Sequence, residues 1–232
     1  VAQAHVNFIS SLSNEDLDKQ MQNFFRVEDC ERLYDQTKSY SHEDREALQK
    51  IETSARKRNG QYEIRVPWRS LPPSMPNNRY QAVAQLKSLC RRFAKDPEYL
   101  REYSEAISKY ESNGFSEKVP PCELKAQPGK ASWLCHHGVQ HERKDLRIVF
   151  DASRKHEGIS LNNSILQGPD LLSSLLGILL RFRQRPVGVS ADIKSFFHCV
   201  LTPLEDADFA RYVWFQDNDP EGPIIEYRML CH

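Results

Sequence analysis

The feature that most constrains the fold of this chain is a change of texture near residue 115. Before it, apolar residues recur at helical spacing, most clearly over residues 79–94 and 96–113. After it, Pro and Gly are frequent, and short β-prone segments surround one apolar helical stretch at residues 170–183. The pattern predicts an α+β fold, in which a helical segment (residues 1–114) precedes a mixed segment (residues 115–232).

Capping residues and chain breakers locate the individual elements. Ser41 favours a helix start, and Asn59-Gly60 favours the end of that helix. Asp96 followed by Pro97 is typical of a second helix start. The strands that we expect are residues 62–68, 132–137, 146–150 and 187–191, and the proline-rich residues 71–78 are expected to form a loop.

Composition excludes two classes of protein. The six cysteines of the 232 residues contain no closely spaced pair, so we expect free thiols in a reducing compartment rather than a disulfide framework. No apolar run approaches the roughly 20 residues that span a membrane, so no membrane partner is expected. The sequence starts at Val1 and stops without a terminating feature, which we interpret as a piece of a longer polyprotein.

The net charge is zero, but the charges are unevenly distributed. Residues 79–185 carry 18 basic and 12 acidic side chains, whereas residues 186–232 carry 3 basic and 8 acidic ones. The first segment is a plausible surface for phosphate groups, and the second a plausible place for a cation. Ordinary fluctuation of charge along a chain is the alternative interpretation.

One carboxylate stands where ligands often bind. The apolar residues 187–191 end at Asp192, and side chains at the carboxyl end of a sheet strand face the crevice that holds ligands. A carboxylate after an apolar run must be hydrogen-bonded or bind a cation. By itself, Asp192 is equally compatible with a residue that ends a strand or caps a helix.

The segment that Asp192 begins resembles the first palm motif of reverse transcriptases. In that motif a metal-binding Asp is followed five positions later by an aromatic residue, here Phe197, and then by a short strand and a Pro, here Pro203. Residues 205–215 resemble the helix and strand that follow in the family, and residues 226–230 resemble the next strand.

A second similarity lies upstream. Arg147 stands four residues before Asp151 in the sequence L-R-I-V-F-D-A-S, which resembles the fingers motif. Together with S-L-N, G-P-x-L, L-L-R-F-R and A-D-I in this order, the chain is most similar to the BEL/Pao class of retrotransposons over residues 115–230. Where that class usually has Pro, this chain has Cys135.

The resemblance implies the fingers and the first part of the palm of a right-hand polymerase, which performs RNA-directed DNA synthesis by nucleotidyl transfer. Such an enzyme uses two Mg²⁺ ions to stabilise the attacking and leaving oxygens. The implied roles are metal binding by the Asp192 carboxylate and the Ile193 carbonyl, and triphosphate binding by Arg147. Phe197 is implied to pack beneath the sugar, and Arg183 and Arg185 to line the template path. A core aromatic and an exposed strand charge are the alternatives for Phe197 and Arg147.

The implied partners are an RNA or DNA template–primer, deoxynucleoside triphosphates, and the rest of the polyprotein: protease, remainder of the palm, RNase H and integrase. The implied location is the cytoplasm, in a retrotransposon particle, or the nucleus. The chain has no Y-x-D-D turn, which supplies two further aspartates in the family, so we expect this piece to be inactive alone. A decayed or co-opted non-catalytic nucleic-acid-binding or scaffold remnant is the main alternative, and a helical interaction module formed by residues 1–115 is a third.

Two further clusters are candidates. Cys122, Cys135, His136, His137 and His141 contain zinc-ligand residue types, although the intervening Gly138-Val139 disfavours the helix that would align them. The basic run Arg56-Lys57-Arg58 is either a phosphate contact or a solvated face.

Overall fold

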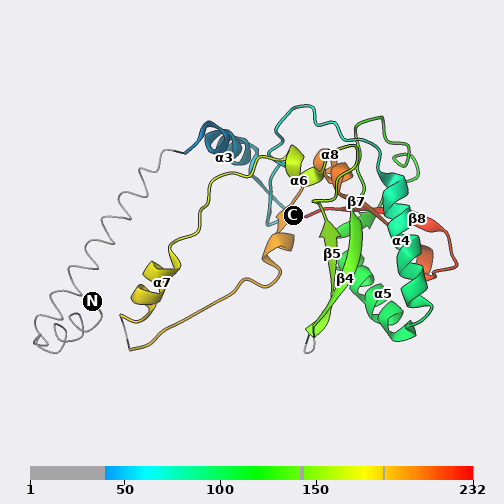
Figure 1. Cartoon of the computed structure of the whole chain (residues 1–232). Coiled ribbons are helices and arrows are strands. Elements are labelled where there is room, and N and C mark those ends of the chain that lie inside the picture. Colours follow the sequence, from blue (N-terminus) through cyan, green and yellow to red (C-terminus); the bar gives the residue numbers. More distant parts are fainter. Residues whose placement is uncertain (1–39, 142–143, 185, 232) are drawn as a thin grey trace, which may run out of the picture. The chain divides into compact units, whose positions relative to one another are not determined.

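The computed structural model describes residues 40–141, 144–184 and 186–231. The chain packs as two compact units. The larger one comprises His42–Gly168 and Asp192–His232, and the smaller one includes Pro169–Ala191. Figure 1 shows the elements of each unit along the chain.

The larger unit alternates helices with short strands. Its elements in chain order are α3 (His42–Ser54), β1 (Arg56–Arg58), β2 (Gln61–Glu63), α4 (Arg79–Phe93), α5 (Pro97–Ser112), β3 (Ser116–Lys118), β4 (Cys135–His141), β5 (Lys144–Asp151), α6 (Leu161–Ser164), η1 (Phe196–Cys199), β6 (Val200–Leu201), α8 (Leu204–Ala207), η2 (Asp208–Ala210), β7 (Arg211–Phe215), η3 (Gln216–Asn218) and β8 (Ile224–Met229). The smaller unit contains α7 (Leu175–Phe182). The α+β class is therefore confirmed.

The described strands form three small sheets. Strands β4 and β5 make an antiparallel hairpin, against which α4 and α5 lie (Figure 1). The second sheet has the order β3-β8-β7 and is antiparallel throughout. In the third, β1 and β2 form an antiparallel hairpin, and β6 joins β2 in parallel.

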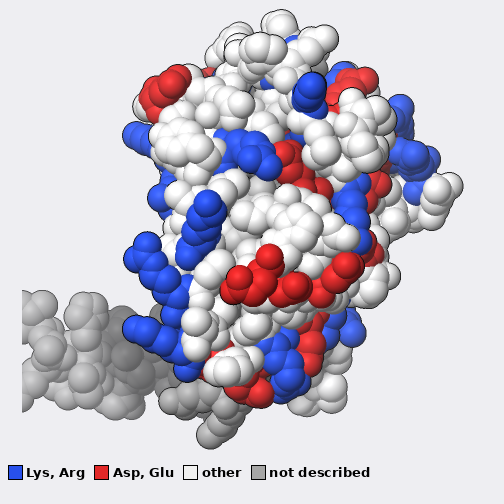
Figure 2. Space-filling model, turned by 90° about the vertical axis from the view of Figure 1, so that its right-hand side faces the viewer, with Lys and Arg blue, Asp and Glu red and all other residues white. Residues whose placement is uncertain are grey.

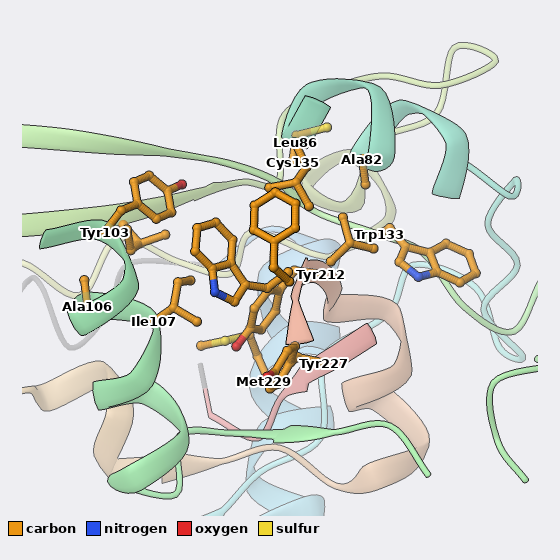
Figure 3. Close-up of a cluster of buried hydrophobic side chains, with 14 of the residues drawn as sticks. Ala82, Leu86, Tyr103, Ala106, Ile107, Trp133, Cys135, Tyr212, Tyr227 and Met229 are labelled. Carbon is orange, nitrogen blue, oxygen red and sulfur yellow. The ribbon is translucent and has the colours of Figure 1, made fainter. Parts of the chain in front are cut away.

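Aromatic side chains dominate the hydrophobic core (Figure 3). Tyr103 of α5 stacks on Trp214 of β7 with ring centroids 5.1 Å apart, and Tyr212 stacks on Tyr227 at 5.2 Å. Each buried aromatic or aliphatic side chain of this kind contributes about 1.5–3 kcal/mol to folding. The core therefore draws on residues from both sides of position 114, where we predicted the change of texture.

The two central helices begin and end where the sequence predicts. Helix α4 begins at Arg79, and α5 begins at Pro97, with the Asp96 carboxylate accepting a hydrogen bond from the Tyr99 N–H at 3.0 Å. The helix that follows Ser41 ends at Ser54, so the predicted end at Asn59-Gly60 is wrong. Asn59 and Gly60 instead form the turn between β1 and β2, because Asn-Gly readily adopts the positive φ values that tight hairpins need.

The predicted strand at residues 187–191 is also wrong. These residues form no strand and pair with no described strand, and Val187 and Val189 are 74% and 82% exposed. An apolar run becomes a strand only when a neighbouring strand accepts its hydrogen bonds. Likewise, only Leu175–Phe182 of the predicted helix at residues 170–183 is helical. No helix in the described part of the chain is long and apolar enough to cross a membrane.

Candidate functional site

Strand β5 presents Arg147 to solvent. Its residues alternate as a half-buried strand requires, with Leu146 and Ile148 buried and Arg147 and Val149 exposed. Across the hairpin, Arg147 pairs with Val139 of β4. The guanidinium is therefore held on a paired strand while it remains free to meet an anion from solvent.

The segment from Asp192 to Phe197 is a surface turn. Asp192 is exposed, Ile193 is 60% exposed and Phe197 is 71% exposed. Ser195 adopts a left-handed conformation with φ of 54°, and this allows the chain to enter the short helix η1. Phe196 and Phe197 meet edge to face, with centroids 5.8 Å apart. The turn thus displays one carboxylate and two aromatic rings.

His198, the residue after Phe197, packs against aromatic residues of the larger unit. Its ring stacks on Phe115 with centroids 4.4 Å apart and meets the edge of Tyr110 at 5.5 Å. Burial lowers the pKa of His198, so the neutral ring is favoured. His198 of η1 is thereby packed against Tyr110 of α5 and against Phe115, which lies three residues after the end of α5.

Tyr110 lies between the two candidate segments. It contacts His198 of η1 on one side and Phe150 of β5 on another, with Phe150 at 5.7 Å. Burial raises the pKa of Tyr110, and the positive charge of Arg147 acts against that rise. The structure therefore brings the strand of Arg147 and the turn of Phe197 to the same aromatic residue, although they are about 50 positions apart in the sequence.

The structure does not bring further metal ligands to Asp192. Among the described residues, no three His, Cys, Asp or Glu side chains are grouped closely enough to hold a metal ion. The zinc hypothesis also fails at His136, because Nδ1 lies 2.6 Å from the Tyr103 hydroxyl and Nε2 lies 2.9 Å from the Val213 carbonyl. Both ring nitrogens of His136 are therefore already used within the core.

Of the two predicted template-path arginines, Arg183 belongs to the smaller unit. Arg183 is exposed and caps the carboxyl end of α7. Arg185 lies outside the described residues. The role of both arginines stays a prediction.

Sequence reasoning missed a buried network of charges. Glu226 is 5% exposed and accepts hydrogen bonds from the Trp133 indole at 2.9 Å and from the Arg211 guanidinium at 3.3 Å. Arg228 is 3% exposed and binds Glu123 at 2.6 Å. These partners are separated by up to 105 positions, so only the excess of acidic over basic residues near the carboxyl end of the sequence hinted at them.

A cavity of about 440 Å³ lies beside the aromatic contacts. Its wall is mainly apolar and includes Trp68, Tyr110, Phe150, His198 and Met229. The one carboxylate in the wall, that of Asp206, already accepts hydrogen bonds from the Trp68 indole and from the Val66 N–H. The cavity therefore offers shape and apolar surface rather than charge.

Comparison with known proteins adds no constraint, since no family model, curated protein or solved structure matches the chain. The surface charge is mixed as well: the face in Figure 2 carries Lys and Arg together with Asp and Glu. Assignment of function therefore depends on the sequence motifs and on where the structure places their residues.

Proposed function

We propose that this chain is the fingers and the first part of the palm of an RNA-directed DNA polymerase encoded by a retrotransposon. The observation that carries the proposal is the meeting of two motifs at Tyr110. Phe150, three residues after Arg147 in the motif that resembles the fingers, and His198, which follows Phe197 in the motif that resembles the palm, both contact this one side chain.

The exposed groups suit the binding of a nucleoside triphosphate. A guanidinium matches the geometry of phosphate oxygens and donates to two of them at once, which is the role proposed for Arg147. Phe197 offers an exposed ring whose bulk opposes a 2′-hydroxyl on the incoming sugar. Both side chains are presented by backbone that is fixed elsewhere, Arg147 by its strand pairing and Phe197 by the stacking of His198.

Asp192 and Ile193 offer oxygen atoms of the type that bind a hard cation. A carboxylate and a backbone carbonyl are the oxygen donors that Mg²⁺ accepts, and Mg²⁺ takes its remaining ligands from phosphate and water. In a polymerase, the bound ions stabilise the attacking and leaving oxygens of the displacement. Asp192 is exposed, so its carboxylate is free to turn toward a metal–nucleotide complex.

The test is binding of a labelled primer–template duplex, first alone and then with Mg²⁺ and the next deoxynucleoside triphosphate. We expect a steep loss of duplex affinity with salt and a nucleotide-dependent gain in affinity. Arg147→Ala should weaken the nucleotide effect by about tenfold, which is the usual worth of a charged hydrogen bond.

Arg91→Ala is the matched control, because Arg91 is an exposed arginine on α4. It should change the nucleotide effect by less than about twofold. Duplex binding without any nucleotide effect in the wild type would instead favour the non-catalytic nucleic-acid-binding remnant. Equal losses in the two arginine variants would remove Arg147 from the proposed site.

A further inference from the structure

The hairpin of β1 and β2 presents basic side chains on both of its faces. Arg56, Lys57 and Arg58 are all exposed, and successive residues of a strand point to opposite faces. Lys57 pairs across the hairpin with Tyr62, so these two side chains share one face. The Tyr62 ring is 59% exposed, and Lys57 makes no ion pair with any described residue.

A buried carboxylate fixes the opposite face. Glu63 is 1% exposed and forms ion pairs with both Arg56 and Arg58, the latter at 2.9 Å. The side chains of the two arginines nevertheless remain 67% and 59% exposed. One carboxylate thus orients two guanidinium groups, which keep a net positive charge and retain N–H groups directed at solvent.

The parallel pairing of β2 with β6 adds more aromatic surface. Tyr62 pairs with Val200, the residue that directly follows η1. Helix η1 therefore ends beside the hairpin and displays Phe196, which is 52% exposed. Lys194, also exposed, lies two residues before η1.

We propose that the β1–β2 hairpin and the adjoining short helix η1 bind single-stranded nucleic acid. Unpaired bases stack on exposed rings such as Tyr62 and Phe196, while basic side chains between the rings contact the phosphates. A duplex buries the faces of its bases and does not use the rings. An acidic peptide would use the charges but would gain little from the exposed aromatic surface. The inference does not depend on the polymerase proposal, because it involves neither Arg147 nor Asp192.

The experiment measures fluorescence anisotropy of a labelled oligothymidylate of about twelve nucleotides, within the usual range of site sizes. Tyr62→Ala should weaken binding by about tenfold, which is the usual effect of removing one stacking ring. Tyr80→Ala is the matched control, since Tyr80 on α4 is 64% exposed and lies outside the hairpin. It should change affinity by less than about twofold.

The salt dependence separates charge from stacking. Lys57→Gln should reduce the slope of log affinity against log salt by about 0.7, the value for one phosphate contact on a single strand. Lys87→Gln, which removes an exposed lysine of α4, should leave the slope unchanged. Arg56 and Arg58 are kept intact, because their removal would leave the buried Glu63 carboxylate without ion-pair partners.

Three results would overturn the inference. One is equal affinity of the two tyrosine variants for the oligonucleotide. The second is competition by polyglutamate as effective as that by unlabelled oligonucleotide, which would point to an acidic protein partner. The third is a duplex that binds at least as tightly as the single strand and loses as little on Tyr62→Ala as on Tyr80→Ala. Unchanged circular dichroism and thermal midpoint of Tyr62→Ala would show that any loss of binding arises at the surface.

Discussion

At the scale of single residues, His136 shows how burial changes the chemistry of a side chain. The ring is 3% exposed, between the Tyr103 hydroxyl that donates to Nδ1 and the Val213 carbonyl that accepts from Nε2. Burial lowers the pKa of His136 to about 4, because a charged imidazolium there would lose its hydration. The sequence showed a histidine-rich strand, but only the fold distinguishes buried His136 from exposed His137.

This histidine should make folding stability depend on pH. The unfolded chain binds a proton near pH 6.5, whereas the folded chain resists protonation down to about pH 4. The stabilisation is therefore fully present above pH 6.5 and is lost as the pH falls toward 4, by up to about 3 kcal/mol. Urea unfolding at pH 7.5, 5.5 and 4.5 measures the loss.

The matched pair of variants for this prediction is His136→Gln and His137→Gln. The first removes the buried titrating group, so the loss of stability between pH 6.5 and 4 should become shallower. The second removes an exposed histidine and should leave the wild-type slope. Half-buried His198, whose pKa is also lowered, contributes in the same direction in all three proteins. A wild-type slope in His136→Gln would contradict the prediction.

At the scale of elements, the sequence predicted the helices better than the strands. Helices α4 and α5 are specified locally, by a repeating apolar stripe and by the Asp96-Pro97 start, and both form as predicted. The strand at residues 187–191 was not determinable in this way, since a strand needs a partner that sequence patterns do not specify. Asn59-Gly60 is compatible both with a helix end and with a hairpin turn, and the structure adopts the turn.

The turn at Gly60 should tolerate asparagine better than alanine. Gly60 has φ of 87°, a region that disfavours residues with a Cβ, although no atom lies within 4 Å of where that Cβ would stand. Gly60→Ala should therefore destabilise the protein by about 1 kcal/mol through the backbone alone. Gly60→Asn should cost less, because asparagine visits this region more readily. Equal unfolding free energies for the two variants would argue against a strained turn.

At the scale of the whole larger unit, long-range pairs of charges join elements that sequence reasoning treated separately. Glu226 of β8 binds Arg79 of α4, the indole of Trp133 and Arg211 of β7. The same was true of the candidate site: the motifs gave Arg147, Asp192 and Phe197 as separate residues, and only packing around Tyr110 relates two of their segments. Local patterns carry no information about such contacts, because their partners lie up to 147 positions apart.

Glu226→Gln tests whether this network holds α4 to the sheet of β7 and β8. The amide fills the same space but has no charge, so the Arg211 guanidinium, which is 1% exposed, loses the carboxylate of its buried partner. Breaking a buried ion pair from one side costs about 3 kcal/mol, even though Asp208 still contacts Arg211. Glu221→Gln alters an exposed carboxylate and should shift the unfolding free energy by less than about 0.5 kcal/mol. We expect chemical unfolding of Glu226→Gln to remain a single transition at lower denaturant, because α4 and the sheet still share one hydrophobic core. Two separate transitions would show that α4 and the sheet fold independently. A midpoint equal to that of Glu221→Gln would show that apolar packing alone holds α4 to the sheet.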